Sequence, residues 1–212
     1  MITSEILFRE EGFDTDLTLY RERASLIIPQ KGQRNSFSVI RSNGGMRFYI
    51  SSTNEAGLEY MKAFFKRLYP CTFDEQNIDS LKSTSMLIIK LSPWNLRRKS
   101  TYNKAFMRGL LHGLSSINGL EFHLCVIVES SRVLLSQTVN FGFAIRIDLA
   151  GDPVHFPRAE IMIRDAISLI RKEKGFRIHI TKKEKFRFYR RTLKDPFDLC
   201  NIIRIPQDEE LS

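Results

Sequence analysis

Residues 37–73 read FSVIRSNGGMRFYISSTNEAGLEYMKAFFKRLYPCTF, and this stretch decides the fold of the chain. The runs 36–41 and 46–51 alternate apolar with polar side chains, which is the pattern of a strand that buries one face. An Asn-Gly-Gly turn at residues 43–45 joins them. A short turn of this composition between two alternating runs indicates a β-hairpin, so we predict one over residues 36–51.

A helix is predicted directly after the hairpin. Ser52, Thr53 or Asn54 can cap its N-terminus, and Glu55 stands in the first turn, where the helix dipole favours a negative charge. Pro70 ends the helix, because proline cannot continue the backbone hydrogen bonds. At helical spacing, the face that is predicted to point inward carries Leu58, Met61, Phe65 and Leu68.

On both sides of this stretch, the predicted elements are strands and helices in irregular order. The first 18 residues are acidic and without a pattern, and they predict an arm or a loose first strand. Apolar periodicity then predicts helices over 99–116 and 157–174. It also predicts strands over residues 23–29, 84–91, 120–129, 141–149 and 176–180.

This order predicts an α+β fold, with an antiparallel or mixed sheet and the helices packed on one face. Strict alternation of strand and helix, which a doubly wound parallel sheet requires, is missing. Two ferredoxin-like halves fit the order. We expect an acidic arm over 1–18, one domain over 19–206 and a tail over 207–212, with lobes 19–92 and 93–206 as the alternative division of the domain.

The net charge of +9 is concentrated in one segment. From Arg171 to Lys194 there are eleven Lys or Arg and two Glu, which gives +9 and leaves the rest of the chain at zero. A concentrated basic segment indicates an anionic partner, meaning nucleic acid, an acidic protein surface or anionic lipid. A solvated helix face is the alternative interpretation.

The basic segment interleaves cations with aromatic residues. In nucleic-acid-binding proteins, such cations neutralise phosphates and aromatic rings stack on bases. Strand alternation instead points Phe186 and Phe188 inward together, which leaves phosphate contact to the cations. A smaller cluster at 97–99 extends the patch if the fold brings the two together. The predicted nucleic-acid-binding residues are Arg97, Arg98, Lys99, Lys182, Lys183, Lys185, Arg187, Arg190 and Arg191.

Catalytic motifs are missing from the sequence. It has no phosphate loop of the form G-x-x-x-x-G-K-[ST], and no G-x-S-x-G, H-E-x-x-H or C-x-x-C. Glu121 and His123 share a strand face and Asp148 lies in the predicted neighbouring strand, so a metal or acid–base site can be drawn from them. Such trios arise readily by chance. We predict no enzyme, no catalytic residue, no metal ligand and no cofactor, with a metal-dependent nuclease as the weakest alternative.

The cysteines and the N-terminus bear on localisation. Cys71, Cys125 and Cys200 are odd in number and far apart, which indicates neither a disulfide framework nor a zinc site. No stretch approaches the roughly 18 consecutive apolar residues of a membrane span, and the first residues carry no secretory signal. We expect a cytoplasmic protein, with a peripheral position at the membrane through partners as the alternative.

Three stretches together resemble a known family. They are residues 37–73, the sequence FAIRIDLAGDP at 143–153 with the helix that follows it, and DLCNIIRIPQDEEL at 198–211. Their order resembles the N-terminal domain of conjugative type IV secretion ATPases and HerA-type DNA translocases. In that family an "fYI" strand precedes a helix ending in "qYP", and a later strand–helix pair comes before the motor. The family's motor carries a phosphate loop, which these 212 residues lack.

The resemblance implies a role in assembly. Domains of this kind dock the motor onto membrane or partner components, or contribute to a ring entrance for DNA. The implied partner is a motor ATPase or a secretion-apparatus subunit, with DNA and further copies of the chain as additional partners. Tyr49, Tyr69 and Pro70 would be scaffold residues, and residues 202–206 would lead to the motor. The alternative function is nucleic-acid binding through residues 171–194.

Overall fold

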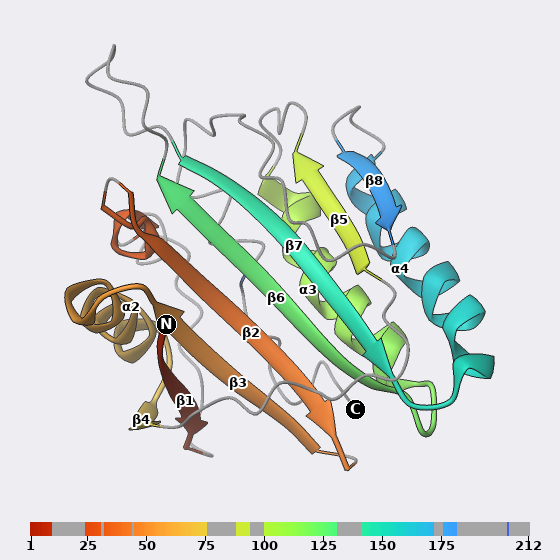
Figure 1. The fold of residues 1–212 in the computed structure, drawn as a ribbon, viewed down its shortest axis with the longest axis horizontal. Helices are drawn as coiled ribbons and strands as arrows, with labels where there is room; N and C mark the ends of the chain where they lie inside the picture. Colours follow the sequence, from red (N-terminus) through yellow and green to blue (C-terminus); the bar gives the residue numbers. More distant parts are fainter. Residues whose placement is uncertain are drawn as a thin grey trace.

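The computed structural model describes residues 1–9, 24–30, 32–43, 45–75, 88–93, 100–130, 141–171, 176–181 and 203. These residues form an α+β fold with one antiparallel sheet and three α-helices (Figure 1). The eight strands lie in the order β4-β1-β3-β2-β6-β7-β5-β8. The predicted α+β class with an antiparallel sheet is therefore confirmed.

The elements follow one another along the chain in two similar sets. The first set contains β1 (Ile2–Phe8), the 3₁₀ turn η1 (Ala24–Ile27), β2 (Arg34–Ser42), β3 (Gly45–Ser52), α2 (Glu55–Leu68) and β4 (Cys71–Glu75). The second contains β5 (Ile88–Pro93), α3 (Ser100–Ser115), β6 (Glu121–Ser130), β7 (Phe141–Ala150), the 3₁₀ turn η2 (Pro153–His155), α4 (Phe156–Arg171) and β8 (Phe176–Thr181).

Each set makes one ferredoxin-like half. When the strands are numbered within their own set, each half has the order 4-1-3-2. Strands 1 and 2 are therefore parallel with strand 3 between them, and strands 3 and 4 are parallel with strand 1 between them. Among the described residues, η1 stands between the first two strands of the first half, where the second half has α3. Because β5 pairs with β7 and β8, it belongs to the second half, and the halves part before residue 88, whereas the sequence suggested a division after residue 92.

The two halves share one continuous sheet. β2 of the first half pairs antiparallel with β6 of the second, in a register that runs from Arg34 opposite Glu129 to Arg41 opposite Phe122. We call this pairing the seam. Figure 1 shows β2 and β6 side by side along their length in the middle of the sheet.

The helices pack on one face of the sheet, as the sequence predicted. Phe37 of β2 stacks on Phe65 of α2, with ring centroids 5.6 Å apart. Arg41, on the same face of β2, reaches the end of α3. The core fills the space between this face and the helices. Its members include Leu58, Met61, Phe64, Phe65 and Leu68 of α2, Leu110, Leu111 and Leu114 of α3, and Phe122, Leu124, Val126 and Val128 of β6.

The hairpin and the first helix agree closely with their predictions. Ser42 lies opposite Gly45 across the turn, and Asn43 takes a positive φ of 51°, which asparagine tolerates better than most residues. Asn54 is the cap of α2, because its side chain accepts a hydrogen bond from the Gly57 N–H at 2.8 Å. Phe64 joins the predicted inward face of the helix.

Two predictions near the N-terminus need correction. The predicted strand over 23–29 is the 3₁₀ turn η1, which packs on α2 through the buried Ile27, whose carbonyl oxygen accepts a bond from Asn35 Nδ2. Of the arm or loose strand predicted for residues 1–18, residues 2–8 are an interior strand that pairs with both β3 and β4. Residues 10–23 lie outside the described part.

Candidate functional site

Polar side chains cross the sheet in one row on the face opposite the helices. The strand registers place Glu5, Tyr49, Ser38, Cys125 and Arg146 next to one another, from β1 through β3, β2 and β6 to β7. We call these five residues the polar row. By register, the row continues to positions 90 of β5 and 179 of β8. It therefore runs across both halves and crosses the seam.

The polar row is buried at its centre. Glu5, Ser38 and Tyr49 are 7%, 2% and 4% exposed, although no helix of the described part lies on this face. Buried polar groups in proteins almost always have a hydrogen-bond partner, and Glu5, Tyr49 and Ser38 each have one here. The Tyr49 hydroxyl donates to the Glu5 carboxylate, and burial followed by the Glu5 charge raises the pKa of Tyr49.

Cys125 is held at the seam by two hydroxyls of the first half. Its thiol is hydrogen-bonded to Ser38 and Ser36 of β2, and burial raises the pKa of the thiol in spite of these bonds. A thiol becomes a nucleophile only as the thiolate, so this environment suppresses reactivity. Cys125 therefore contributes to the contact between β2 and β6, and its setting is not that of a catalytic cysteine.

Arg146, Asp148 and His123 form a cluster of ionisable side chains on β6 and β7. Arg146 Nε donates to Asp148 Oδ1 at 2.8 Å, which is a charge-assisted bond. Asp148 lies directly opposite His123 in the register, with Oδ2 4.0 Å from His123 Nδ1. The sequence had predicted that Asp148 lies in the strand beside His123, and this is confirmed.

The other nitrogen of His123 has no partner. Nε2 is buried and makes no hydrogen bond. Burial lowers the pKa of His123, and the nearby Asp148 charge opposes this shift. The imidazole is consequently held neutral at neutral pH, because a charged ring would need a solvated or paired second N–H.

The trio that the sequence suggested for a metal does not assemble into a metal site. Glu121 Oε1 lies at the hairpin turn, where it accepts from the Asn43 N–H at 3.3 Å. Within the described residues, no three His, Cys, Asp or Glu side chains are grouped so that they could hold a metal ion. Of the trio, only His123 and Asp148 come together.

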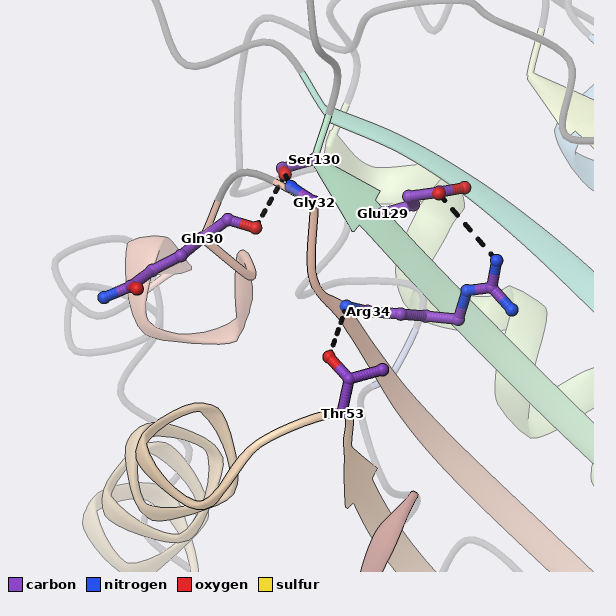
Figure 2. A network of polar contacts seen from close by, with 6 residues as sticks. All are labelled: Gln30, Gly32, Arg34, Thr53, Glu129 and Ser130. Carbon is purple, nitrogen blue, oxygen red and sulfur yellow. Dashed lines mark hydrogen bonds and ion pairs between the residues drawn. The ribbon is translucent and has the colours of Figure 1, made fainter.

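A second polar network fastens one end of the seam (Figure 2). Ser130 Oγ at the end of β6 donates to Gln30 O at 2.7 Å and accepts from the Gly32 N–H at 3.0 Å. Arg34 N–H donates to Thr53 Oγ1 at 3.0 Å, and the Arg34 guanidinium lies 3.8 Å from Glu129. The loop before β2 is thereby attached to the last residues of β6.

The predicted nucleic-acid-binding residues all lie outside the described part of the chain. They are Arg97, Arg98 and Lys99 before α3, and Lys182, Lys183, Lys185, Arg187, Arg190 and Arg191 after β8. The structure therefore says nothing of whether the two clusters lie close together.

Sequence reasoning missed most of the polar row. The sequence indicated that Asp148 lies in the strand beside His123, but Ser38, Tyr49 and Glu5 join this face only through the pairing of distant strands. The one available signal was the run of small polar residues on one side of β2, at Ser36 and Ser38.

No family model, no curated protein and no solved structure matches the chain. Among the described helices, none has the length and the apolar character that a membrane crossing requires.

Proposed function

We propose that the chain is a non-catalytic docking domain that works with a DNA-translocating ATPase of the conjugation or HerA kind. The proposal starts from the resemblance of residues 37–73, 143–173 and 198–211 to the N-terminal domain of those motors. Two of these stretches span consecutive elements of the fold. Residues 37–73 cover most of β2 and continue through β3 and α2 into β4, and residues 143–173 cover most of β7 and α4.

The observation that carries the proposal is the set of polar contacts between the two halves along the seam. Polar contacts join the two halves at one end through Ser130, at the centre through Cys125 and Ser38, and at the other end through Arg41 and the end of α3. We infer that two halves joined in this way move as one body. Such a body suits a domain that holds a motor in place while the motor moves.

The chemistry of the polar row supports the same role. Glu5 and Tyr49 bond to each other, and the Cys125 thiol has a raised pKa. Beside the row, burial lowers the pKa of His123, whose Nε2 makes no hydrogen bond. A general base needs a pKa near the working pH and access to a substrate proton. These groups are arranged for packing and for the contact between strands.

Affinity purification from the source cells tests the docking role. The tagged chain, cross-linked before lysis, is expected to retain a RecA-like ATPase that carries a phosphate loop. The same tag on an unrelated ferredoxin-like protein is the control. Recovery of the tagged chain as a monomer, with no such ATPase enriched over the control, would contradict the proposal.

Nucleic-acid binding through the basic segment is the second candidate function. It is favoured by the charge of +9 that lies within residues 171–194. If it is correct, the logarithm of the affinity for duplex DNA falls linearly with the logarithm of the salt concentration, by about 0.9 for each phosphate contacted.

Two variants with the same change in net charge distinguish binding through the basic segment from non-specific electrostatic attraction. Reversal to Glu at Lys182, Lys183, Lys185, Arg190 and Arg191 is expected to abolish binding and flatten the salt dependence. The control reverses five exposed cations elsewhere and therefore changes the net charge equally, at Arg47, Lys66, Arg67, Arg108 and Arg158. Equal losses in both variants, or no loss in the first, would exclude a specific role for the basic segment.

A further inference from the structure

The two edges of the sheet differ in charge. The charged residues of β4 and its neighbour β1 are all acidic, whereas β8 and its neighbour β5 carry basic residues and no acidic one. The acidic residues are Glu5, Asp74 and Glu75, and the basic residues are Lys90, Arg177 and His179. Lys62 of α2 lies 3.9 Å from Glu75 Oε1 and offsets part of its charge. The sheet therefore has an acidic edge at β4 and a basic edge at β8.

Charges of both edges lie on the face that carries the polar row. By register, Asp74 lies beside Glu5 at one end of the row, and Lys90 lies beside Arg146 at the other. Arg177 shares this face, because it is two residues from the register partner of Lys90. On this face, the outermost charges thus change from acidic at one edge of the sheet to basic at the other.

The directions of the edge strands allow one copy of the chain to extend the sheet of another. Among the described strands, β4 and β8 each have a neighbour on one side only. Every ladder is antiparallel and the sheet has eight strands, so β4 and β8 run in opposite directions. With the helices of both copies on the same side, β8 of one copy beside β4 of the next would continue the antiparallel pattern.

The residues of the two edge strands also match. All five residues of β4 find a partner within β8 when Phe73 lies opposite Ile178. This register places Asp74 opposite Arg177 on the face of the polar row, and it pairs two apolar residues on the helix face. Two β4 edges would instead bring acidic residues together, and two β8 edges would bring basic residues together. Like edges therefore repel, and unlike edges attract.

We propose that copies of this chain associate head to tail, with β8 of one copy added to the β4 edge of the next. A contact between two different surfaces of one chain builds a closed ring or an open row of copies, and a twofold dimer is not formed. The association involves only copies of this chain, so its outcome with the purified protein is independent of any ATPase.

Sedimentation of the purified full chain at low salt, over a range of protein concentrations, tests the proposal. The mass of the wild type should rise with concentration. Asp74→Arg and Arg177→Asp should each raise the dissociation constant about tenfold, because an opposed pair of charges becomes a like pair. The double variant exchanges the two charges and should restore association. Glu59→Arg and Arg158→Asp make the same changes in net charge at exposed positions on α2 and α4, and should behave like the wild type.

A wild type that stays monomeric at every concentration would overturn the proposal. A loss of association in only one of the two single variants would do so as well, because it indicates contact between like edges. No recovery in a folded double variant would also count against it.

Amide hydrogen exchange of the unaltered chain covers the case in which a variant does not fold. Amides of β4 and β8 that point away from the sheet gain acceptors in the association, so their protection should rise with protein concentration. Amides of β2 and β6, in the middle of the sheet, should keep the same protection. If the protection of β4 and β8 does not depend on concentration, the two edges do not pair.

Discussion

Arg41 of β2 donates from Nη1 to the carbonyl oxygen of Leu114, near the C-terminal end of α3, over 3.2 Å. The same nitrogen donates to Ile117 O, also over 3.2 Å. Each of these oxygens also accepts a backbone N–H, Leu114 O from Ile117 and Ile117 O from Leu120. The C-terminal end of a helix carries a partial negative charge, so a guanidinium is well matched to it. Because Arg41 belongs to the first half and α3 to the second, this contact joins the halves at the end opposite Ser130.

Arg41→Gln should weaken the fold by about 1–3 kcal/mol, because the carbonyl groups of Leu114 and Ile117 lose a charged donor in a half-buried place. Urea unfolding measures the change in the free energy of unfolding. The matched control is Arg47→Gln, since Arg47 is exposed and bonds to Ser42 Oγ within its own hairpin. The control should stay within about 0.5 kcal/mol of the wild type. Two equally small effects would show that Arg41 does not fasten the seam.

Gly57→Ala should destabilise the chain although alanine is the better helix former. A Cβ at residue 57 would lie 2.3 Å from Ser52 Oγ and 2.7 Å from the capping oxygen of Asn54. Ser52 is fully buried, so it cannot move aside without disturbing the core. We expect a loss of about 1–3 kcal/mol from this overpacking, partly offset by about 1 kcal/mol of helix propensity. Gly45→Ala, where the nearest atom is 3.9 Å away, should be close to neutral.

Asn54→Ala should cost about 0.5–2 kcal/mol, because the Gly57 N–H at the start of α2 loses its acceptor. Asn54→Ser or Asn54→Asp should restore most of the lost stability, since both side chains can accept the same bond. Thermal or urea unfolding of the three variants makes the comparison. If the serine and aspartate variants are as unstable as the alanine variant, the contribution of Asn54 does not come from capping.

The thiols at 71 and 125 should react slowly in the folded chain. Burial raises the pKa of Cys71 to about 11, against the lowering effect of Lys66 and Arg9, and burial raises the pKa of Cys125 as well. At pH 8 the thiolate of Cys71 is then about a hundredfold scarcer than for a free cysteine. In a Cys200→Ser background, a thiol reagent should modify neither residue quickly until urea is added. Fast modification of either residue in the folded chain would contradict the burial of that thiol.

The same shift gives Cys71 a defined effect on stability. The folded state keeps the Cys71 thiol protonated over a pH range in which the unfolded chain has already lost this proton. Stability should therefore decline as pH rises above the ordinary thiol pKa of about 8.5 toward 11, and Cys71→Ser should remove this part of the decline. Urea unfolding between pH 7.5 and pH 10.5 measures it. An identical decline in wild type and variant would contradict the assignment.

Local patterns were sufficient to predict the elements that bury one face. The hairpin, α2 and β6 each show a clear period, because one side meets the core and the other does not. β1 shows none, because Ser4 and Glu5 are both buried and lie on opposite faces of the strand. A strand buried on both faces shows no alternation of apolar and polar residues. The acidic residues nearby therefore led to the prediction of an arm.

The site depends on registers that no local pattern contains. The polar row exists because Ser38 pairs with Cys125, 87 positions away, and because Tyr49 pairs with Glu5. The shared face of His123 and Asp148 could be predicted, since β6 and β7 are consecutive strands. The roles of Arg146 and Ser38 could not, because each depends on which strand lies beside its own and in which register.

The proposed docking role requires that the two halves move as one body. Native-state hydrogen exchange at increasing urea concentrations tests this most directly, with amides of β3 reporting on the first half and amides of β7 on the second. We predict that the most protected amides of both strands open with the same free energy and the same urea dependence, equal to those of global unfolding. Two sets that differ by more than about 1 kcal/mol, each with a smaller urea dependence, would contradict a single body.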